Sequence, residues 1–383
     1  HLDMDAFFAA IEERDRPRFA GLPIVVGADP AEGKGRGVVS TANYKAREYG
    51  IHSAMPITEA WRLSQIAKSK GQPEAIFLQP NFEKYEASSV KILGIIRNRI
   101  CDAPKPPSVI PAEAGIQGSR SRIKYGMTNV PLVEPASIDE FYLDLSFVEG
   151  FQLAGELARQ IKKEIKQKER LTASVGIAPN KLVAKIASDM QKPDGLTIVR
   201  DDQAEAFLEP LPIRKIPGIG PKAEEVLARK GVRLVCDMKR LTEDELREMF
   251  SKWGVDMYRK IRGIDESPVT EGYEAKSIGE QETFSVDTRD AEFIMGRIKR
   301  MAGNVIRRLR AEGFCSFRTV VLTVRFSDFE TKTRSHTLGE ATDSSRALEF
   351  KVIKLFLPFL DKRENPKSKL IRLIGVRVEK LVQ

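Results

Sequence analysis

The chain has 383 residues, of which 42% are hydrophobic and 31% are charged, a composition typical of folded proteins and a length too great for one domain. Its three cysteines and three histidines lie far apart, which argues against a disulfide framework, a cysteine-rich zinc site and a multi-histidine metal site. No segment approaches the ~18 consecutive apolar residues of a membrane span, and the N-terminus lacks the layout of a signal peptide, so the sequence argues against a membrane protein and against export.

Strands alternate with helices over the first 200 residues, which predicts an α+β sheet domain. The sequence begins without a methionine, directly on a short apolar strand that turns by residue 8, so a few upstream residues are expected to be missing. Further strands are predicted at 23–27, 38–41, 75–78, 133–145 (interrupted by a turn), 171–177 and 196–199. Helices are predicted around 9–14, 44–47, 56–64, 82–99, 151–168 and 180–190.

Residues 102–131 interrupt this alternation with a concentration of prolines and glycines. A breaker-rich segment of this length inside a folded domain is typical of an inserted, mobile or functional loop. We expect a surface-exposed, largely disordered insertion that leaves the neighbouring carboxylates in place.

The second half of the chain contains two further segments. Residues 201–265 are almost entirely helical and broken by glycines, and 266–276 are interpreted as a linker. A β-α-β-β-α-β order is predicted for 277–383, which indicates a small split-βαβ domain.

The whole chain carries a net charge of +9, and residues 276–383, with 22 Lys and Arg against 14 Asp and Glu, carry +8 of it. A basic C-terminal segment in an otherwise nearly neutral chain is typical either of a protein that binds a polyanion or of a solvated basic surface without a partner.

Two pairs of carboxylates interrupt apolar strands. Asp3 and Asp5 are two positions apart and project from one face of a strand, and Asp139 and Glu140 lie at a strand–turn–strand junction. Such carboxylates are costly unless their charge is neutralised, so they either pair with Lys and Arg or bind a metal. With few histidines and cysteines in the chain, carboxylate ligands favour a hard ion such as Mg²⁺.

Phosphoryl transfer by two magnesium ions is the chemistry that uses carboxylates from separate strands in this way. In that arrangement Asp3 and Asp139 would bridge the ions and Glu140 would hold the ion that activates the nucleophile. The backbone carbonyl of Met4 would fill one position. Asp5 would be either an outer support of the site or a salt-bridge partner.

Candidate groups for binding a triphosphate also occur in the sequence. Tyr44 and Arg47 are three positions apart on a predicted helix and share a face, and a guanidinium suits bidentate phosphate contact. Lys192 precedes Pro-Asp-Gly at a helix end, where its amine could reach over a pocket. Each residue taken singly also fits a solvated surface position.

The turn Gly218-Ile219-Gly220 lies between two predicted helices, with Lys222 beside it. Two glycines allow a tight turn with positive φ, and the N-terminus of the following helix offers backbone N–H groups to a phosphate. The segment resembles the helix-hairpin-helix element that binds the DNA backbone, and an ordinary turn between helices is the alternative.

Seven motifs occur in the order found in Y-family translesion DNA polymerases, and the chain most resembles the bacterial DNA polymerase IV type. The resemblance covers nearly the whole chain and rests on L-D-M-D-A-F-F (2–8), T-A-N-Y-K-A-R (41–47), S-I-D-E-F-Y-L-D (137–144), A-K-I-A-S-D-M-Q-K-P-D-G (184–195), I-P-G-I-G (216–220), K-S-I-G (276–279) and I-G-V-R (374–377). It implies an α+β multidomain right-hand fold. The implied parts are a palm at 1–8 and 80–200, small fingers at 9–79, a helical thumb with a helix-hairpin-helix at 201–265, a linker at 266–276 and a little finger at 277–383.

The resemblance implies template-directed addition of deoxynucleotides to a primer 3′ end by two-metal phosphoryl transfer, past damaged template bases and without proofreading. Positions matching the family's two-magnesium site are Asp3, Asp139 and Glu140, with the backbone of Met4. Nucleotide-binding positions are matched by Phe8, Thr41, Tyr44, Arg47 and Lys192. Phe8 matches the steric gate, whose ring would exclude a ribose 2′-OH by a clash. DNA-binding positions are matched by Gly218, Gly220, Lys222, Lys276, Arg334, Arg372 and Arg377.

The implied partners are primer–template DNA and deoxynucleoside triphosphates, and the protein is expected to act as a monomer in the bacterial cytoplasm. A sliding clamp is expected from the family, although the sequence ends at Gln383 without a visible clamp-binding segment. The alternatives are a non-catalytic DNA-binding protein that keeps the fold, and another two-metal palm enzyme such as a nucleotide cyclase. The intact carboxylates argue against the first, and the Gly-x-Gly turn and basic C-terminal segment argue against the second.

Overall fold

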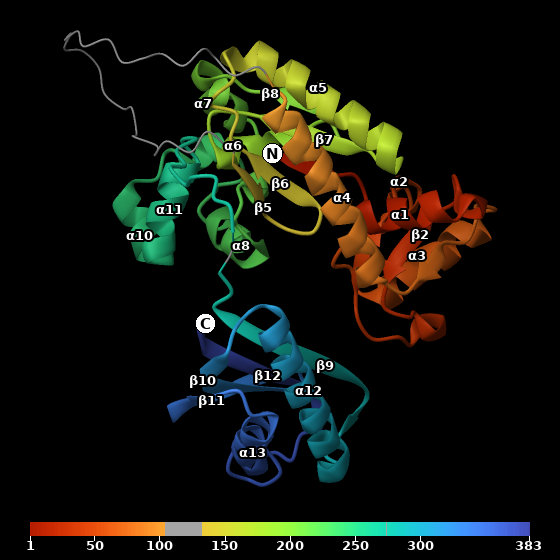
Figure 1. Ribbon diagram of the computed structural model, residues 1–383, viewed down its shortest axis with the longest axis vertical. Coiled ribbons are helices and arrows are strands. Elements are labelled where there is room, and N and C mark those ends of the chain that lie inside the picture. Colours follow the sequence, from red (N-terminus) through yellow and green to blue (C-terminus); the bar gives the residue numbers. More distant parts are fainter. Residues whose placement is uncertain (104–131, 273) are drawn as a thin grey trace. The chain divides into compact units, whose positions relative to one another are not determined.

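The structure, a computed structural model, describes residues 1–103, 132–272 and 274–383 (Figure 1). The predicted insertion at 102–131 therefore lies almost wholly outside the described residues. Within them the strands form three sheets, and contacts divide the chain into two units. The first unit comprises 1–27, 39–55 and 62–272, and the second comprises 28–38, 56–61 and 273–383.

A five-stranded sheet organises the first unit, in the order β5-β6-β1-β7-β8. Its strands are β1 (Leu2–Met4), β5 (Val133–Pro135), β6 (Glu140–Leu143), β7 (Ala173–Ile177) and β8 (Leu196–Ile198). The central strand β1 runs antiparallel to both β6 and β7, which places Asp3 opposite Glu140 on one side and Ser174 on the other. Because side chains alternate across a sheet, these three residues share one face while Leu2, Phe141 and Val175 enter the core on the other.

Helices cover both faces of this sheet. The helices α4 (Phe82–Cys101) and α5 (Gly150–Glu169) pack on the apolar face, together with α1 (Phe7–Asp15). The helix α6 (Lys181–Ser188) crosses β7 on the opposite face. A Cβ atom at Gly176 would lie 2.0 Å from the carbonyl oxygen of Ala184, so glycine at this position lets α6 approach the sheet.

A three-stranded sheet lies between α1 and α4 in the sequence. Its order is β3-β2-β4, formed by β2 (Ile24–Gly27), β3 (Val39–Ala42) and β4 (Ile76–Leu78). The short helix α2 (Tyr44–Arg47) follows β3 and is capped by Asn43, whose side chain accepts a hydrogen bond from the Ala46 N–H at 3.0 Å. The helix α3 (Ile57–Ser69) precedes β4.

The segment after β8 is helical, as predicted. It contains α7 (Ala204–Leu208), α8 (Pro221–Ala228), α9 (Val235–Met238), α10 (Glu243–Phe250) and α11 (Lys252–Lys260). Leu182 and Ile186 of α6 belong to the hydrophobic core of this segment.

Short 3₁₀ helices occur at Pro17–Phe19, Ala31–Gly33, Asp201–Gln203, Ile213–Lys215 and Leu357–Phe359.

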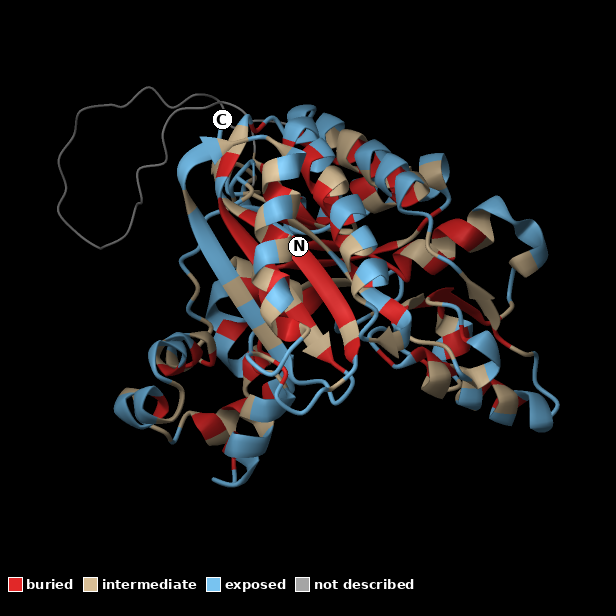
Figure 2. Ribbon diagram, turned by 90° about the horizontal axis from the view of Figure 1, so that it is seen from below, coloured by how far each residue is buried: buried red, intermediate tan, exposed pale blue. Residues whose placement is uncertain are grey.

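The second unit contains an antiparallel sheet in the order β11-β10-β12-β9. Its elements are β9 (Ser277–Thr288), α12 (Ala291–Ala311), β10 (Ser316–Phe326), β11 (Thr331–Thr342), α13 (Ser345–Phe356) and β12 (Ile371–Val382), which confirms the predicted β-α-β-β-α-β order. The two helices pack on one face of the sheet, and apolar side chains of both layers form its core. Buried residues gather between helices and sheets, and the outer faces of the helices are exposed (Figure 2).

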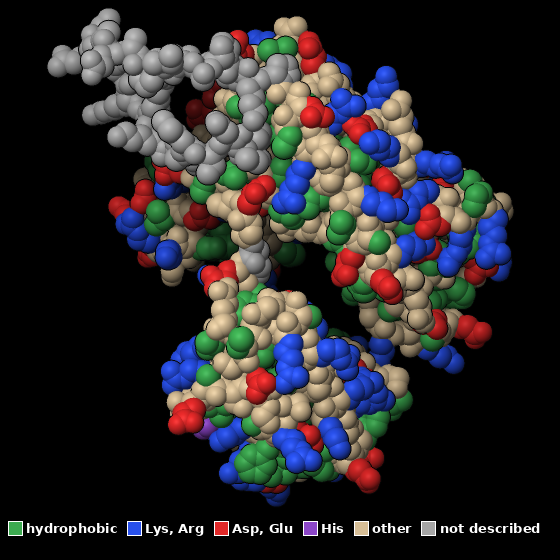
Figure 3. All heavy atoms as spheres, in the orientation of Figure 1, with side chains coloured by type: hydrophobic (Ala, Val, Ile, Leu, Met, Phe, Trp, Pro, Cys, Tyr) green, Lys and Arg blue, Asp and Glu red, His purple; other side chains and the backbone are tan. Residues whose placement is uncertain are grey.

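Basic side chains are spread over the second unit, as the space-filling view shows (Figure 3). In the described part of the chain, no helix has both the length and the apolar character needed to cross a membrane.

Candidate active site

The strand pairing brings the predicted carboxylates together at the middle of the five-stranded sheet. Asp3 on β1 faces Glu140 on β6, and the Met4 N–H donates a hydrogen bond to the carbonyl oxygen of Asp139 at 3.0 Å. The turn before β6 is held by Ser137, whose hydroxyl donates to Asp139 Oδ1 at 2.7 Å and accepts from the Glu140 N–H at 3.1 Å. Asp3 and Glu140 therefore share one sheet face, and Asp139 lies next to them in the turn that precedes β6.

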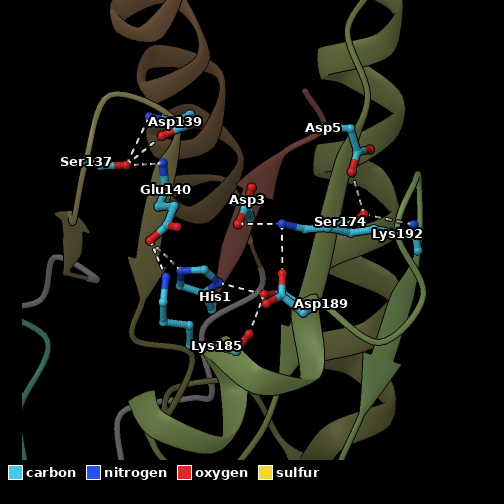
Figure 4. A network of polar contacts seen from close by, with 12 residues as sticks. His1, Asp3, Asp5, Ser137, Asp139, Glu140, Ser174, Lys185, Asp189 and Lys192 are labelled. Atoms are coloured by element: carbon cyan, nitrogen blue, oxygen red, sulfur yellow. Dashed lines mark hydrogen bonds and ion pairs between the residues drawn. The ribbon is translucent and has the colours of Figure 1, made fainter. Parts of the chain in front are cut away.

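Two lysines from the α6 region close onto these carboxylates (Figure 4). Lys192 Nζ lies 2.7 Å from Asp3 Oδ2 and 2.9 Å from Asp189 Oδ1. Lys185 Nζ lies 2.5 Å from Glu140 Oε2. Lys185 lies on α6, and Lys192 lies in the segment that follows the end of α6 at Ser188. Lys192 was predicted from the sequence and Lys185 was not, because the pairing of Lys185 with Glu140 depends on how α6 packs on the sheet.

The electrostatics of the group depend on burial and on these lysines. Burial raises the pKa of Asp3 to about 6 despite the opposing effect of Lys192, and burial also raises the pKa of Asp139. The His1 ring and the Lys185 ammonium hold the pKa of Glu140 at about 2. Burial disfavours the charge of Lys192, but Asp3 and Asp189 raise its pKa. Three carboxylates thus share two lysine counter-ions, which leaves negative charge on the sheet face.

The donor set fits a hard divalent cation, because it consists of carboxylate oxygens on two adjoining strands. Among the described residues, no three His, Cys, Asp or Glu side chains are arranged so that they could hold one ion as they stand. The lysine pairs account for this, since Asp3 and Glu140 each turn an oxygen toward an ammonium group. The backbone thus places the carboxylates where they could bind a cation, but their side chains are turned toward lysines instead.

Asp5 connects this group to the predicted nucleotide-binding residues. Its carboxylate accepts hydrogen bonds from the Ser174 hydroxyl and the Asp194 N–H, both at 2.8 Å, and from the Tyr44 hydroxyl at 3.4 Å. Burial and the nearby Asp5 raise the pKa of Tyr44 to about 12, so its hydroxyl stays protonated at neutral pH. Of the two roles left open by the sequence, these contacts fit an outer support of the site.

The other predicted nucleotide contacts lie on the three-stranded sheet and α2. The Arg47 guanidinium lies 4.6 Å from the Tyr44 ring centroid, and Arg47 Nε donates to the Ala42 carbonyl oxygen at 2.9 Å. The structure thus brings Arg47 and Tyr44 together, as their spacing predicted. Thr41 lies on β3 opposite Val26.

Phe8 is held by aromatic neighbours that sequence reasoning did not identify. Its ring stacks on Tyr85 of α4 at a centroid distance of 4.3 Å and meets Phe82 edge-on at 5.8 Å. The Tyr85 hydroxyl donates to Glu12 Oε1 at 2.8 Å, which fixes the stacking partner in turn. Phe8 is therefore a partly buried ring in a defined position near the start of α1.

The Gly218–Gly220 turn precedes α8, as predicted. Gly218 has φ +101°, and a Cβ atom there would lie 3.3 Å from the Trp253 ring of α11. Gly220 occupies the N-cap position of α8, Pro221 begins the helix, and Lys222 is exposed. The turn needs glycine at 218 both for its backbone conformation and for the approach of Trp253.

The four basic residues predicted to bind DNA from the second unit differ in their surroundings. Arg334 pairs through its Nε and a terminal nitrogen with both carboxylate oxygens of Glu364, at 2.6 and 2.5 Å. Arg334 lies opposite Leu322 in the sheet, on the face covered by the helices, whereas Arg377 lies opposite Val321 on the other face. Lys276 and Arg377 are exposed, and the Arg372 guanidinium lies 4.7 Å from the Phe329 ring centroid.

Comparison with protein families matches most of the chain to models of one family. The impB/mucB/samB family model matches residues 2–112 and 115–189, its C-terminal domain model matches 275–383, and the IMS family HHH motif matches 200–232. Among curated relatives, DNA polymerase IV of Methanoculleus marisnigri is 40% identical over 100% of this chain and 93% of its own length. DNA polymerase IV of Streptococcus agalactiae serotype Ia is 38% identical, with the same coverage of both chains.

Solved structures agree with these sequence matches. A Y-family DNA polymerase chimera, Dbh-Dpo4(243-245)-Dbh, superposes with a TM-score of 0.78 at 28% identity, covering 100% of this chain and 98% of its own. An insertion ternary complex of Dbh DNA polymerase gives a TM-score of 0.63 at 28% identity, with the same coverage.

Proposed function

We propose that this chain, which belongs to the impB/mucB/samB family of Y-family DNA polymerases, catalyses nucleotide transfer to a primer 3′ end at Asp3, Asp139 and Glu140. The family activity is template-directed DNA synthesis, including synthesis past damaged template bases without proofreading. The observation that carries this location is the register of β1 and β6, which sets Asp3 opposite Glu140 on one sheet face beside Asp139.

Enzymes of this family depend on metal ions, and we assign two Mg²⁺ ions to these three carboxylates and the Met4 backbone carbonyl. Two such ions, when bound, stabilise the attacking and leaving oxygens of an in-line phosphoryl transfer. The contribution of the protein itself is to position the three carboxylates. The Ser137 turn and the β1–β6 register fix the backbone of Asp3, Asp139 and Glu140 before any ligand arrives.

The nucleotide would lie beside this group, with its triphosphate on Tyr44, Arg47 and Lys192 and its sugar against Phe8. Thr41 completes the set of proposed contacts. Asp5 holds the Tyr44 hydroxyl, which links the triphosphate contacts to the catalytic strand. The rigid Phe8–Tyr85 stack supports a steric gate, because a ring that cannot move aside discriminates against a 2′-OH.

We propose that DNA is held mainly through its backbone, with Gly218, Gly220 and Lys222 on one strand. The candidates in the second unit are Lys276, Arg334, Arg372 and Arg377. Arg377 lies on the sheet face that the helices leave uncovered, and it would exchange its ion pair with Glu379 for a phosphate, as Arg334 would exchange Glu364.

We further propose the parts of a right hand: palm at 1–8 and 80–200, fingers at 9–79, thumb at 201–265, linker at 266–276 and little finger at 277–383. Primer–template DNA and deoxynucleoside triphosphates are the proposed substrates, and a sliding clamp is a proposed partner. We place the protein in the cytoplasm as a monomer.

Primer extension tests this proposal. With Mg²⁺, a primed template and all four deoxynucleotides, the wild-type chain should extend the primer and Asp139→Ala should lose at least about 10³-fold in rate, because a charge that stabilises the transition state is removed. Asp144→Ala, which removes a nearby carboxylate outside the proposed site, is the matched control. Equal rates of primer extension by wild type and Asp139→Ala would contradict the proposal.

A further inference from the structure

The proposed mechanism does not use the charge of Lys185, although Lys185 belongs to the carboxylate–lysine group in Figure 4 and makes a short contact with Glu140 there. Its Nζ lies 2.5 Å from Glu140 Oε2, and its side chain is 33% exposed against 26% for that of Glu140. Lys192, by contrast, neutralises Asp3 and has a proposed role on the triphosphate. Lys185 therefore needs an explanation of its own.

We propose that Lys185 is a positioning residue that neutralises Glu140 in the metal-free enzyme and competes with the divalent cation for this carboxylate. This inference rests on the proposed function. A lysine in this place would lower the affinity for the ion and keep three neighbouring carboxylates from repelling one another before the ion arrives.

The backbone around Lys185 is fixed, so the exchange of lysine for cation needs only a side-chain movement. The Lys185 carbonyl oxygen accepts a hydrogen bond from Ser188 Oγ at 2.7 Å, and His1 Nδ1 lies 2.9 Å from the same hydroxyl. The close approach of Ala184 to Gly176 holds this turn of α6 on the sheet. The Lys185 side chain is flexible and about one-third exposed, so its ammonium group can move into solvent while α6 stays in place.

The type of residue also supports the inference. An ammonium is a compact, strongly hydrated point charge, so water can replace its contact with Glu140 at modest cost. An arginine would hold the carboxylate through two parallel hydrogen bonds and would be displaced less readily by a cation. Lysine therefore suits a counter-ion that must be released.

Lys181 provides a matched control on the same helix. It lies one turn earlier and pairs with Glu134, whose Oε2 is 2.6 Å from Lys181 Nζ. Glu134 is not a proposed ligand, so Lys181→Met removes an α6 lysine and its ion pair without touching the carboxylate group.

The test is a titration of the protein with Mn²⁺ in the absence of DNA and nucleotide, with free Mn²⁺ measured by electron paramagnetic resonance. Lys185→Met should bind Mn²⁺ about tenfold more tightly than wild type, the change expected when one half-buried competing charge is removed. Its melting temperature without ions should fall and be restored by Mn²⁺, because Glu140 loses its ammonium counter-ion and keeps only weaker support from the His1 ring, whose Nε2 lies 3.5 Å from Glu140 Oε2, until the ion binds. Lys181→Met should bind Mn²⁺ as wild type does.

An unchanged or weaker Mn²⁺ affinity in folded Lys185→Met would overturn the inference, as would an equal gain in Lys181→Met. If Lys185→Met does not fold, Lys185→Arg decides the matter: it should bind Mn²⁺ several-fold more weakly than wild type, and an unchanged affinity would overturn the inference. Asp139→Ala separates the two proposals. Equal Mn²⁺ binding by wild type and Asp139→Ala contradicts the proposed function, whereas a loss in Asp139→Ala with no effect of Lys185→Met contradicts only the role of Lys185.

Discussion

Asp3 and Glu140 lie directly opposite each other on the antiparallel strands β1 and β6, although they are far apart in the sequence. Each also accepts a hydrogen bond from a lysine of the α6 region. Lys185 on α6 and Lys192, in the segment that follows it, thus neutralise one carboxylate on each of two neighbouring strands.

Gly176→Ala should destabilise the first unit by about 1–3 kcal/mol, the usual cost of forcing an extra methyl group into a packed core. The new Cβ would lie 2.0 Å from the Ala184 carbonyl oxygen and 2.5 Å from the Ser188 nitrogen, so α6 must move away from β7. Urea unfolding measures the change. Gly94→Ala, in α4 with no atom within 4 Å of the new Cβ, should be neutral or slightly stabilising, and equal losses in the two variants would contradict the packing argument.

Phe8→Ala should reduce the preference for deoxynucleotides over ribonucleotides by about 10- to 200-fold, the range that a small steric difference in a pocket can supply. Deoxynucleotide incorporation should change much less, because the ring is proposed to act by exclusion. Single-nucleotide incorporation kinetics with matched pairs of nucleotides give the ratio. Phe82→Ala removes the exposed ring that meets Phe8 edge-on and should keep the wild-type preference. Unchanged selectivity in Phe8→Ala would remove Phe8 from this role.

Gly218→Ala should weaken duplex DNA binding and destabilise the turn by about 1 kcal/mol or more, because alanine is strained at positive φ. The added Cβ would also press on the Trp253 ring, 3.3 Å away. Gly231→Ala is the control, since Gly231 has φ +78° with open space around its Cβ. Fluorescence anisotropy with a labelled primer–template should show weaker binding for Gly218→Ala alone. Equal DNA affinity in both variants would argue against a DNA contact at this turn.

The pair of Arg334 and Glu364 makes the stability of the second unit depend on pH. The Arg334 hydrogen bonds hold the pKa of Glu364 below its ordinary value of 4.5. A lowered folded-state pKa contributes stability that is complete above the unfolded-state value and is lost as pH falls through the folded-state value. The melting temperature of wild type should therefore exceed that of Glu364→Gln at pH 7, and the difference should shrink below pH 4.5. Glu340→Gln, at an exposed position of β11, should show no such trend. A difference that persists at low pH would exclude this origin.

Much of the fold follows from the sequence because the hydrophobic patterns are regular. The order of elements from 277 to 383 was predicted correctly, since long strands with alternating side chains and one long amphipathic helix leave little ambiguity. The two-residue spacing predicted that Asp3 and Asp5 share a strand face, but β1 ends at Met4, and Asp5 lies in the following turn, where it contacts Ser174 and Tyr44. Boundaries moved by a few residues where helices extend beyond their apolar positions, as α3 does to Ser69.

Side-chain partners were harder to predict because they depend on tertiary packing. Lys185 belongs to the motif at 184–195. Its pairing with Glu140 nevertheless follows from the approach of α6 to β7, which the sequence of the motif alone does not specify. The family resemblance implied the same DNA-binding role for Arg334 and Arg377, but the two lie on opposite faces of their sheet because their register positions differ by one. The contact between Phe8 and Tyr85 joins two helices and has no counterpart in local sequence.

The most direct test of the whole account is a crystal structure of the protein with Mn²⁺, primer–template DNA and an incoming nucleotide, in which the ions are located by anomalous scattering. We predict anomalous peaks bounded by the carboxylates of Asp3, Asp139 and Glu140, with Lys185 withdrawn from Glu140. Peaks located away from these three side chains, or carboxylates still bound to lysine beside an ordered nucleotide, would contradict the account.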